Sequence, residues 1–319
     1  MSDLPAIREV SELLRENWQI EPEMVSVWPK SPRLYRVEGY GFARVGFPRG
    51  GLRATQLVEC VNTLHMSGCA VPATVPTSHG ELSIELGEMA LSVERSLPGE
   101  ECSGANLSIL PQVGRDLGTI HSTIYNNDVI PGCVRTLGEW IDHTVEKAQV
   151  WAVEWDHGAH MRAFASILGD EYRDLKAGFG LTHGDVRSPN VLAQGDRLGF
   201  VDFNPKFEPQ LCDVVKIRNK WLMNGDVRFE RPLTLAELSG FLSGYHETRP
   251  LSEDEVASFP IIWAVEQSWR LAQDLRSTSM FSEDRACHWP ISQQINELPM
   301  AMDFGRRILA TASLECVDV

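Results

Sequence analysis

The residues from His183 to Asn190 could carry out phosphoryl transfer. Asp185 lies five residues before Asn190, and Asp202 follows twelve residues after Asn190. A carboxylate can accept the proton of a hydroxyl group, while an amide oxygen and a second carboxylate are hard ligands of the kind that Mg²⁺ prefers. Phosphoryl transfer needs mainly an oriented hydroxyl and metal-held phosphates. The pattern therefore indicates a kinase active site, with Asp185 as base and Asn190 and Asp202 as metal ligands.

The residues between Asn190 and Asp202 are typical of a β-hairpin that would bring these two side chains together. Apolar runs at 191–193 and 198–201 flank Gly195, and a glycine between two such runs suits a tight turn. A surface loop rich in Asp and Asn would explain part of this pattern. That alternative leaves the joint spacing of base and metal ligands without a role, so we favour the catalytic interpretation.

Two further side chains of the loop have expected roles. Arg187 lies two positions after Asp185, where its charge could stabilise the phosphate during transfer or could hold the loop against an acidic neighbour. Arg187 is therefore a candidate catalytic residue. His183 is a candidate for structural support of the loop, because a histidine in this place more often makes hydrogen bonds than acts as an acid or base.

The same motif resembles the aminoglycoside phosphotransferase and choline kinase superfamily. The catalytic loop of that superfamily has the form His-Gly-Asp-(Leu/Val)-x-x-x-Asn, and its metal aspartate stands in an Asp-Phe or Asp-Trp pair, as Asp202 and Phe203 do here. Homoserine kinase-like members are the most similar, because further segments echo them in the same order: 71–77 with Gly80, 97–99, 117–121, 244–245 and 249–251.

The resemblance implies an α+β, two-lobed protein kinase-like fold that uses ATP and Mg²⁺. A small β-rich nucleotide lobe would comprise residues 1–95. A larger helical lobe, residues 96–319, would contain the catalytic loop and the acceptor site. The resemblance also implies that Asp213 supports the catalytic loop.

The periodicity of apolar residues agrees with this division. Before residue 96 it predicts helices at 7–18 and 52–66, and strands at 34–37, 42–47, 82–86 and 90–94. After residue 96 it predicts mainly helices, at 107–125, 137–153, 161–177, 235–245 and 256–275.

The expected nucleotide lobe departs from the protein-kinase pattern. Arg44 occupies the third-strand place where protein kinases carry a phosphate-binding lysine, although an exposed strand arginine would fit as well. Glu59, on the next helix, is its expected partner, unless it belongs only to a solvated face. The segment 28–33 replaces a glycine-rich phosphate loop, and its two prolines lack N–H groups. Glu94 and Ser96 lie in a segment that resembles the hinge, where backbone groups would bind adenine.

The resemblance implies that the acceptor is a hydroxyl group on a small polar molecule. Glu266, Arg270 and Asp274 are spaced four residues apart on the helix 256–275 and so share a face, where they could bind a homoserine-like amino alcohol. An aminoglycoside-type antibiotic is the alternative, favoured by the acidic balance of the chain. A nucleotide-binding pseudokinase regulator is an alternative of another class, motivated by Arg44 and the missing glycine-rich loop.

Composition excludes several other classes of protein. The formal net charge of −15 disfavours nucleic acid and anionic membranes as partners. No apolar run approaches the length of a membrane span, and the first residues do not show a secretory signal. The seven cysteines lack metal-binding spacing and are expected to be free thiols. These features predict a cytoplasmic enzyme.

Overall fold

The structure is a computed structural model that describes residues 4–21, 25–29, 31–48, 52–125, 136–153, 175–224, 228–229, 231–280 and 297–314. Contacts within the chain divide it into two compact units. The first unit is Met1–Glu100 with Leu192–Lys206, and the second is Glu101–Val191 with Phe207–Val319. None of the helices in the described ranges combines the length and apolar character that a membrane span requires.

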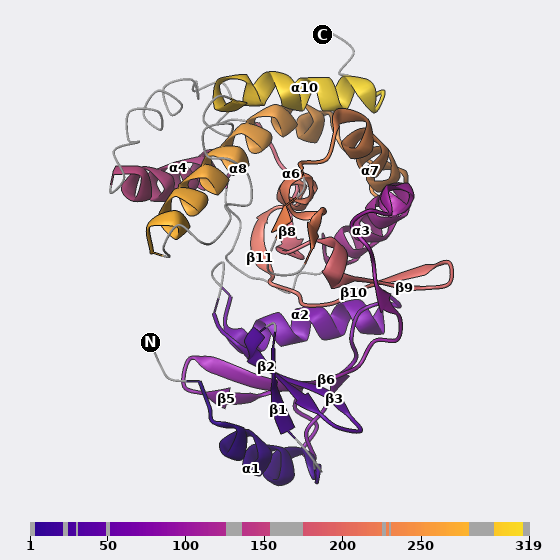
Figure 1. The fold of residues 1–319 in the computed structure, drawn as a ribbon, viewed down its shortest axis with the longest axis vertical. Helices are drawn as coiled ribbons and strands as arrows, with labels where there is room; N and C mark the ends of the chain where they lie inside the picture. Colours follow the sequence, from indigo (N-terminus) through magenta and orange to yellow (C-terminus); the bar gives the residue numbers. More distant parts are fainter. Residues whose placement is uncertain are drawn as a thin grey trace. The chain divides into compact units, whose positions relative to one another are not determined.

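An antiparallel sheet forms the centre of the first unit, with strand order β1-β2-β3-β6-β4 and β5 paired with β6 (Figure 1). Helix α1 lies on one side of this sheet and α2 on the other in Figure 1. The elements are α1 Ile7–Trp18, β1 Val25–Trp28, β2 Ser31–Val37, β3 Gly41–Gly46, α2 Ala54–Met66, β4 Thr74–Val75, β5 Ile84–Leu86, β6 Met89–Arg95 and β7 Glu100–Glu101.

Successive side chains of β3 point to opposite faces of the sheet, and this alternation decides which of them enter the core of this unit. Ala43 and Val45 are buried in a cluster that α1 completes with Val10 and Leu14. Because successive side chains of a strand point to opposite faces, Arg44 leaves the sheet on the other side. The packing that buries Ala43 and Val45 therefore also fixes the direction of the Arg44 guanidinium.

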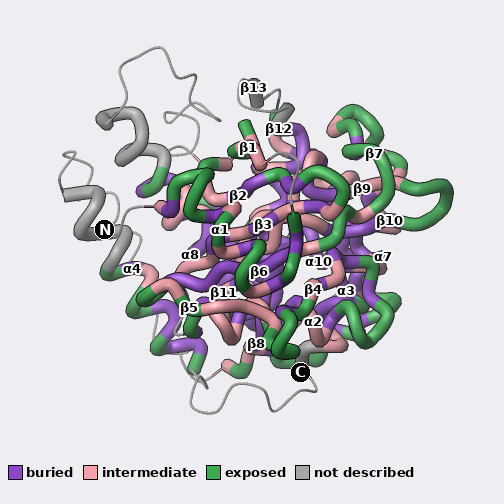
Figure 2. The backbone as a smooth tube through the Cα atoms, turned by 90° about the horizontal axis from the view of Figure 1, so that it is seen from below, coloured by how far each residue is buried: buried purple, intermediate pink, exposed green. Residues whose placement is uncertain are grey.

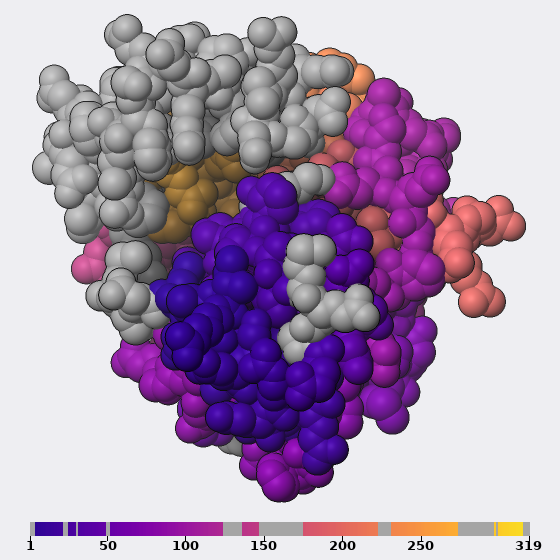
Figure 3. Space-filling view, turned by 60° about the horizontal axis from the view of Figure 1, so that its bottom comes forward, coloured from indigo at the N-terminus to yellow at the C-terminus, as the bar shows by residue number. Residues whose placement is uncertain are grey.

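The hairpin of β9 (Val191–Gln194) and β10 (Arg197–Phe200) joins the first unit from Leu192 onwards. Gly195 makes its turn with φ +59°, and the residues of the tip are exposed (Figure 2). The tip stands out in salmon on the face shown in Figure 3. At the other end, Phe200 N–H donates to Ala70 O at 2.8 Å. This attachment brings Asp202, two residues later, into the unit that contains Arg44.

The second unit is mainly helical, with α10 packed on α7 and α8, and α3 packed on α7 (Figure 1). Its elements are η1 Leu107–Ile109, α3 Leu110–Tyr125, α4 Leu137–Val153, β8 Phe179–Thr182, η3 Ser188–Asn190, β11 Lys206–Pro209, α6 Leu211–Lys220, β12 Met223–Asn224, β13 Arg228–Phe229, α7 Leu235–Thr248, α8 Glu253–Met280, η4 Leu298–Met300 and α10 Ala301–Thr311. The predicted α+β class is confirmed. Of the predicted helix 161–177, residues 161–174 lie outside the described part.

Helices α3 and α7 approach so closely that two glycines are required at their contact. A Cβ atom on Gly114 would meet the backbone oxygen of Phe241, and one on Gly244 would meet that of Pro111, both closer than real Cβ contacts allow. Since the obstructing atoms belong to the backbone, a change of rotamer cannot relieve the overlap.

We expect Gly244→Ala to destabilise the protein by about 1–3 kcal/mol, the range for overpacking a core. Gly240→Ala is the matched control in the same helix, because its Cβ would lie 3.6 Å from Pro111 Cγ, an ordinary contact. The control should be neutral or stabilise the helix by up to about 1 kcal/mol. Urea unfolding of both variants measures the difference, and equal stabilities would contradict the close approach.

Candidate active site

Asp213 holds the backbone of the loop that precedes Asp185. Its carboxylate accepts hydrogen bonds from His183 N–H at 2.6 Å and from Gly184 N–H at 2.9 Å. Gly184 has φ +78°, a left-handed conformation that glycine adopts without strain. The fully buried His183 lies inside this turn, where its Nδ1 accepts from Asp185 N–H at 3.2 Å. These contacts fix the direction in which the Asp185 side chain leaves the loop.

A buried chain of hydrogen bonds stands behind Asp213. His121 Nε2 lies 3.2 Å from Asp213 Oδ2, and His121 Nδ1 lies 2.8 Å from the Tyr245 hydroxyl. Burial lowers the pKa of His121, so the neutral ring can donate to Asp213 and accept from Tyr245. Burial alone would raise the pKa of Asp213, but the hydrogen bond from His121 and nearby positive charge hold it well below its usual range. Asp213 therefore stays ionised.

Three polar side chains contact the carboxylate of Asp185. Asn190 Nδ2 donates to Asp185 Oδ2 at 3.0 Å and to its backbone oxygen at 2.9 Å. Arg187 Nε lies 3.1 Å from Oδ2, and Lys220 Nζ donates to Oδ1 at 2.7 Å. Burial alone would raise the pKa of Asp185, but Lys220 and Arg187 lower it to about 2. The carboxylate is therefore ionised and held at both oxygens.

Lys220 was not among the candidates from the sequence. It is the last residue of α6, a helix that is buried on nearly every side, and it lies 35 residues after Asp185. No local motif connects two residues that far apart. The sequence does not single it out, because the segment 211–220 also contains Lys216 and Arg218.

The residues proposed to bind a metal have suitable chemistry. The amide nitrogen of Asn190 is occupied by Asp185, which leaves its carbonyl oxygen as the group able to bind a cation. Asp202 supplies carboxylate oxygens, and it adopts φ +56°, a left-handed conformation that Asp tolerates better than most residues. Amide and carboxylate oxygens are the donors that suit Mg²⁺.

Arg44 forms ion pairs with two carboxylates of the first unit. Its Nε lies 3.0 Å from Glu94 Oε1, and its Nη1 lies 2.9 Å from Asp202 Oδ1. In the β3–β6 register, Arg44 pairs with Ser92 and Phe42 pairs with Glu94, so Glu94 is the diagonal neighbour of Arg44 on one face. Although burial opposes its charge, the two carboxylates raise the pKa of Arg44 above its usual range.

The expected pairing of Arg44 with Glu59 is wrong. Glu59 is exposed on α2, whose buried side is formed by Leu57 and Cys60 among others, and Arg44 is paired with Glu94 instead. The helix turns Glu59 to solvent because the flanking apolar residues take the inner face. Ser96 is exposed directly after β6. Roles of Glu59, Glu94 and Ser96 in nucleotide binding stay predictions.

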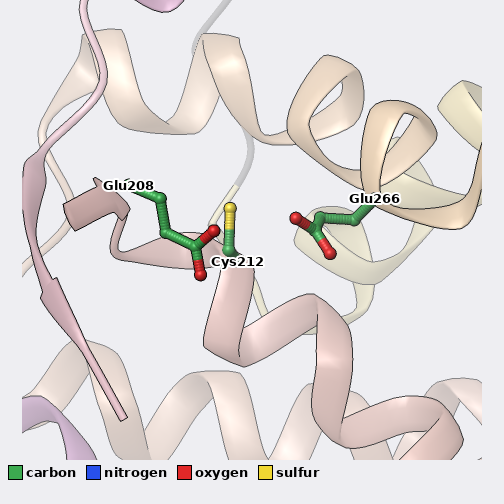
Figure 4. A group of neighbouring side chains, drawn as sticks. All are labelled: Glu208, Cys212 and Glu266. Atoms are coloured by element: carbon green, nitrogen blue, oxygen red, sulfur yellow. The ribbon is translucent and has the colours of Figure 1, made fainter. Parts of the chain in front are cut away.

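Glu266 lies in a buried group with Glu208 and Cys212 (Figure 4). Lys216 Nζ forms an ion pair with Glu208 and lies 4.0 Å from Glu266. Burial raises the pKa of the Cys212 thiol well above its usual range, which disfavours the thiolate form that binds metals. Since a lysine already supplies positive charge to this group, we interpret it as an internal ion network and assign it no metal.

The other two acceptor candidates lie further along α8. Arg270 is half-buried and close enough to Lys220 for its charge to lower the pKa of that lysine, together with the larger effect of burial. The side chain of Asp274 lies outside the described part. Trp263, also on α8, is buried and packs against Phe304 with ring centroids 5.3 Å apart and the ring planes tilted by 37°, which indicates a role in core packing.

Comparison with known proteins gives a consistent assignment. Residues 48–251 match the model of a family described as "Phosphotransferase enzyme family". A homoserine kinase of Rhizobium rhizogenes is 28% identical over 200 residues, a match that covers 61% of this chain and 60% of that protein. The chain thus matches less than two thirds of the length of this relative.

Two solved structures share the fold at low sequence identity. The first is an amicoumacin kinase in complex with AMP-PNP and Ca²⁺, with TM-score 0.66, 14% identity, and coverage of 91% of this chain and 92% of that one. The second is a choline kinase of Cryptosporidium parvum, with TM-score 0.61, 10% identity, and coverage of 97% and 98%. These similarities confirm the predicted kinase-like fold.

Proposed function

Because the chain belongs to the phosphotransferase enzyme family, we propose that it transfers the terminal phosphate of ATP to a hydroxyl group of a small polar molecule. The observation that carries this proposal is the ionised carboxylate of Asp185, held by Asn190, Arg187 and Lys220. A fixed carboxylate can orient a hydroxyl group for in-line attack. Asp213 and His183 would support the loop and take no part in proton transfer.

In the proposed reaction, Asp185 accepts the hydroxyl proton late. A carboxylate with a pKa of about 2 is a weak base, but the hydroxyl becomes strongly acidic as its oxygen bonds to phosphorus. Arg187 would stabilise negative charge on the phosphoryl oxygens. Mg²⁺, when bound, would neutralise charge on the ATP phosphates. The carbonyl oxygen of Asn190 and the carboxylate of Asp202 would be its protein ligands.

We propose a homoserine-like amino alcohol as the acceptor. The name of the curated relative supports this substrate class. The charges beside Asp185 support it too, because both Arg187 and Lys220 form ion pairs with its carboxylate. Such an environment favours an acceptor that carries a carboxylate and repels a polycation. An antibiotic acceptor is the second candidate, suggested by the acidic balance of the chain.

The decisive experiment is ADP release with a panel of amino alcohols, aminoglycosides and other hydroxyl compounds. The affinity for a zwitterionic acceptor should depend little on salt, and polyamines should not compete with it. The affinity for a polycationic acceptor should depend on salt, and polyamines should compete with it. Phosphorylation of aminoglycosides alone would overturn the proposed acceptor. ATP binding without turnover on the whole panel would favour the pseudokinase alternative.

Arg44 is proposed to bind the ATP phosphates. We expect Arg44→Ala to weaken ATP binding by about 1.5–3 kcal/mol, the range for a hydrogen bond to a charged group. Arg44→Lys should recover part of this loss. Arg36→Ala removes an exposed arginine of the neighbouring strand β2 and serves as control. Titration calorimetry measures the affinities of wild type and the three variants, and equal affinity in wild type and Arg44→Ala would assign Arg44 to its ion pairs alone.

A further inference from the structure

Lys220 is held rigidly beside the carboxylate of Asp185. Its Nζ lies 2.7 Å from Asp185 Oδ1 and 3.4 Å from the backbone oxygen of Gly184. The next residue, Trp221, is completely buried, which fixes the end of α6. The C-terminal end of a helix also favours a positive charge. A long and usually flexible side chain is thus confined to one position.

The contacts of Asp185 distinguish its two oxygens. Oδ2 accepts from Asn190 Nδ2 and lies 3.1 Å from Arg187 Nε. Among the described residues, Oδ1 has Lys220 as its partner. Each carboxylate oxygen offers about two lone pairs. Oδ2 therefore has two neighbouring groups, the Asn190 amide and the Arg187 guanidinium, whereas Oδ1 has one, which makes Oδ1 the less crowded oxygen for the acceptor hydroxyl.

We propose that Lys220 is a positioning residue of the phosphotransfer reaction, which fixes Asp185 so that Oδ1 receives the proton of the acceptor hydroxyl. This inference rests on the proposed function. In the step, the acceptor O–H bond breaks as its oxygen bonds to phosphorus, and the proton moves to Oδ1. The bond from phosphorus to the β,γ-bridging oxygen of ATP breaks, and its electron pair leaves with ADP. Lys220 stays protonated throughout.

The charge of Lys220 acts on both partners of the proton transfer. It makes Asp185 a weaker base, and it also stabilises negative charge that develops on the acceptor oxygen beside Oδ1. The lower basicity of Asp185 opposes catalysis. Any net gain in rate should therefore come from the fixed orientation of Asp185 and from stabilisation of the negative charge that develops on the acceptor oxygen. The rate of turnover should therefore respond to Lys220 far more than ATP binding does.

The test compares kcat and KM for Lys220→Met, Lys220→Gln and Lys220→Arg with the best acceptor of the panel. We expect Lys220→Met to lower kcat about 10- to 100-fold while KM for ATP changes less than about 2-fold. Lys220→Gln keeps a donor without charge and should also be impaired, whereas Lys220→Arg should recover part of kcat. In an Asp185→Asn background, Lys220→Met should have no further effect on residual kcat, because its target carboxylate is gone.

Arg218→Met is the matched control, since Arg218 is a buried cation of the same helix that pairs with Glu297. It should lose stability and keep kcat per folded molecule. Wild-type turnover in the panel is the test of the proposed function itself. With an active wild type, normal kcat in folded Lys220→Met or Lys220→Gln would overturn the role of Lys220 alone. An undiminished effect of Lys220→Met in the Asp185→Asn background would do the same.

Discussion

Replacing Asp185 with Asn should reduce turnover by about 10²- to 10⁴-fold, the usual contribution of a general base. The asparagine keeps the size of the side chain and can still contact Lys220 through its oxygen. It has lost the charge and the basicity needed to take the hydroxyl proton. ATP affinity should change little, because the proposed phosphate and metal ligands are other residues. Steady-state kinetics and nucleotide titration measure the two effects separately.

Asp202→Ala provides the contrast to this variant. It removes a proposed metal ligand, so we expect it to weaken Mg²⁺-dependent ATP binding as well as turnover. It also removes one of the two carboxylates that pair with Arg44, an effect that persists without metal. Retention of most activity by Asp185→Asn would contradict the kinase assignment, whatever Asp202→Ala shows.

Replacing Asp213 with Ala should destabilise the protein by about 3–5 kcal/mol, the cost of leaving buried partners of a charged group unpaired. The N–H groups of His183 and Gly184 would lose their acceptor, and His121 would lose its partner. All three lie in buried surroundings. Urea unfolding should show the loss directly. Turnover should also fall in the molecules that remain folded, because the direction of Asp185 depends on this loop.

Asp196→Ala is the matched control for Asp213→Ala. Asp196 is an exposed aspartate in the turn of the β9–β10 hairpin. Its replacement should change the free energy of unfolding by less than about 0.5 kcal/mol, as for most surface substitutions. Similar effects of the two variants would show that Asp213 does not support the loop as its contacts suggest.

The elements with a clear period were predictable from the sequence. The helices Ile7–Trp18 and Leu137–Val153 have the predicted bounds, since each combines an apolar stripe with a polar face. Helix α6, Leu211–Lys220, was not predicted, because it buries polar and charged residues such as Asp213 and Arg218 together with its apolar ones, so its buried side does not follow the apolar residues. The strands β8 and β11 were also missed, because a run of four residues is too short to show a clear alternation of apolar and polar residues.

The residues that form the site were easier to predict from the sequence than the contacts between them. Asp185 and Asn190 are close in sequence, and their contact follows from the short loop between them. The partners of Arg44 and Asp185 depend on long-range packing: Asp202 lies 158 residues after Arg44, and Lys220 lies 35 residues after Asp185. The protein-kinase pattern suggested Glu59 of the next helix for Arg44, but the sheet register placed Glu94 beside it.

The first unit is discontinuous in sequence, and this has a consequence for the order of folding during synthesis. Residues 1–100 leave the ribosome early, but residues 192–206 of the same unit are added only after 101–191. Until then Ala70 O lacks its bond from Phe200, and Arg44 has Glu94 but not Asp202 as a counter-ion. Domains generally fold as units, N-terminal ones first. Here the N-terminal unit cannot be completed until its last segment has been synthesised. A nascent chain that stalls before residue 192 therefore contains an incomplete first unit, in which Arg44 lacks one of its two counter-ions.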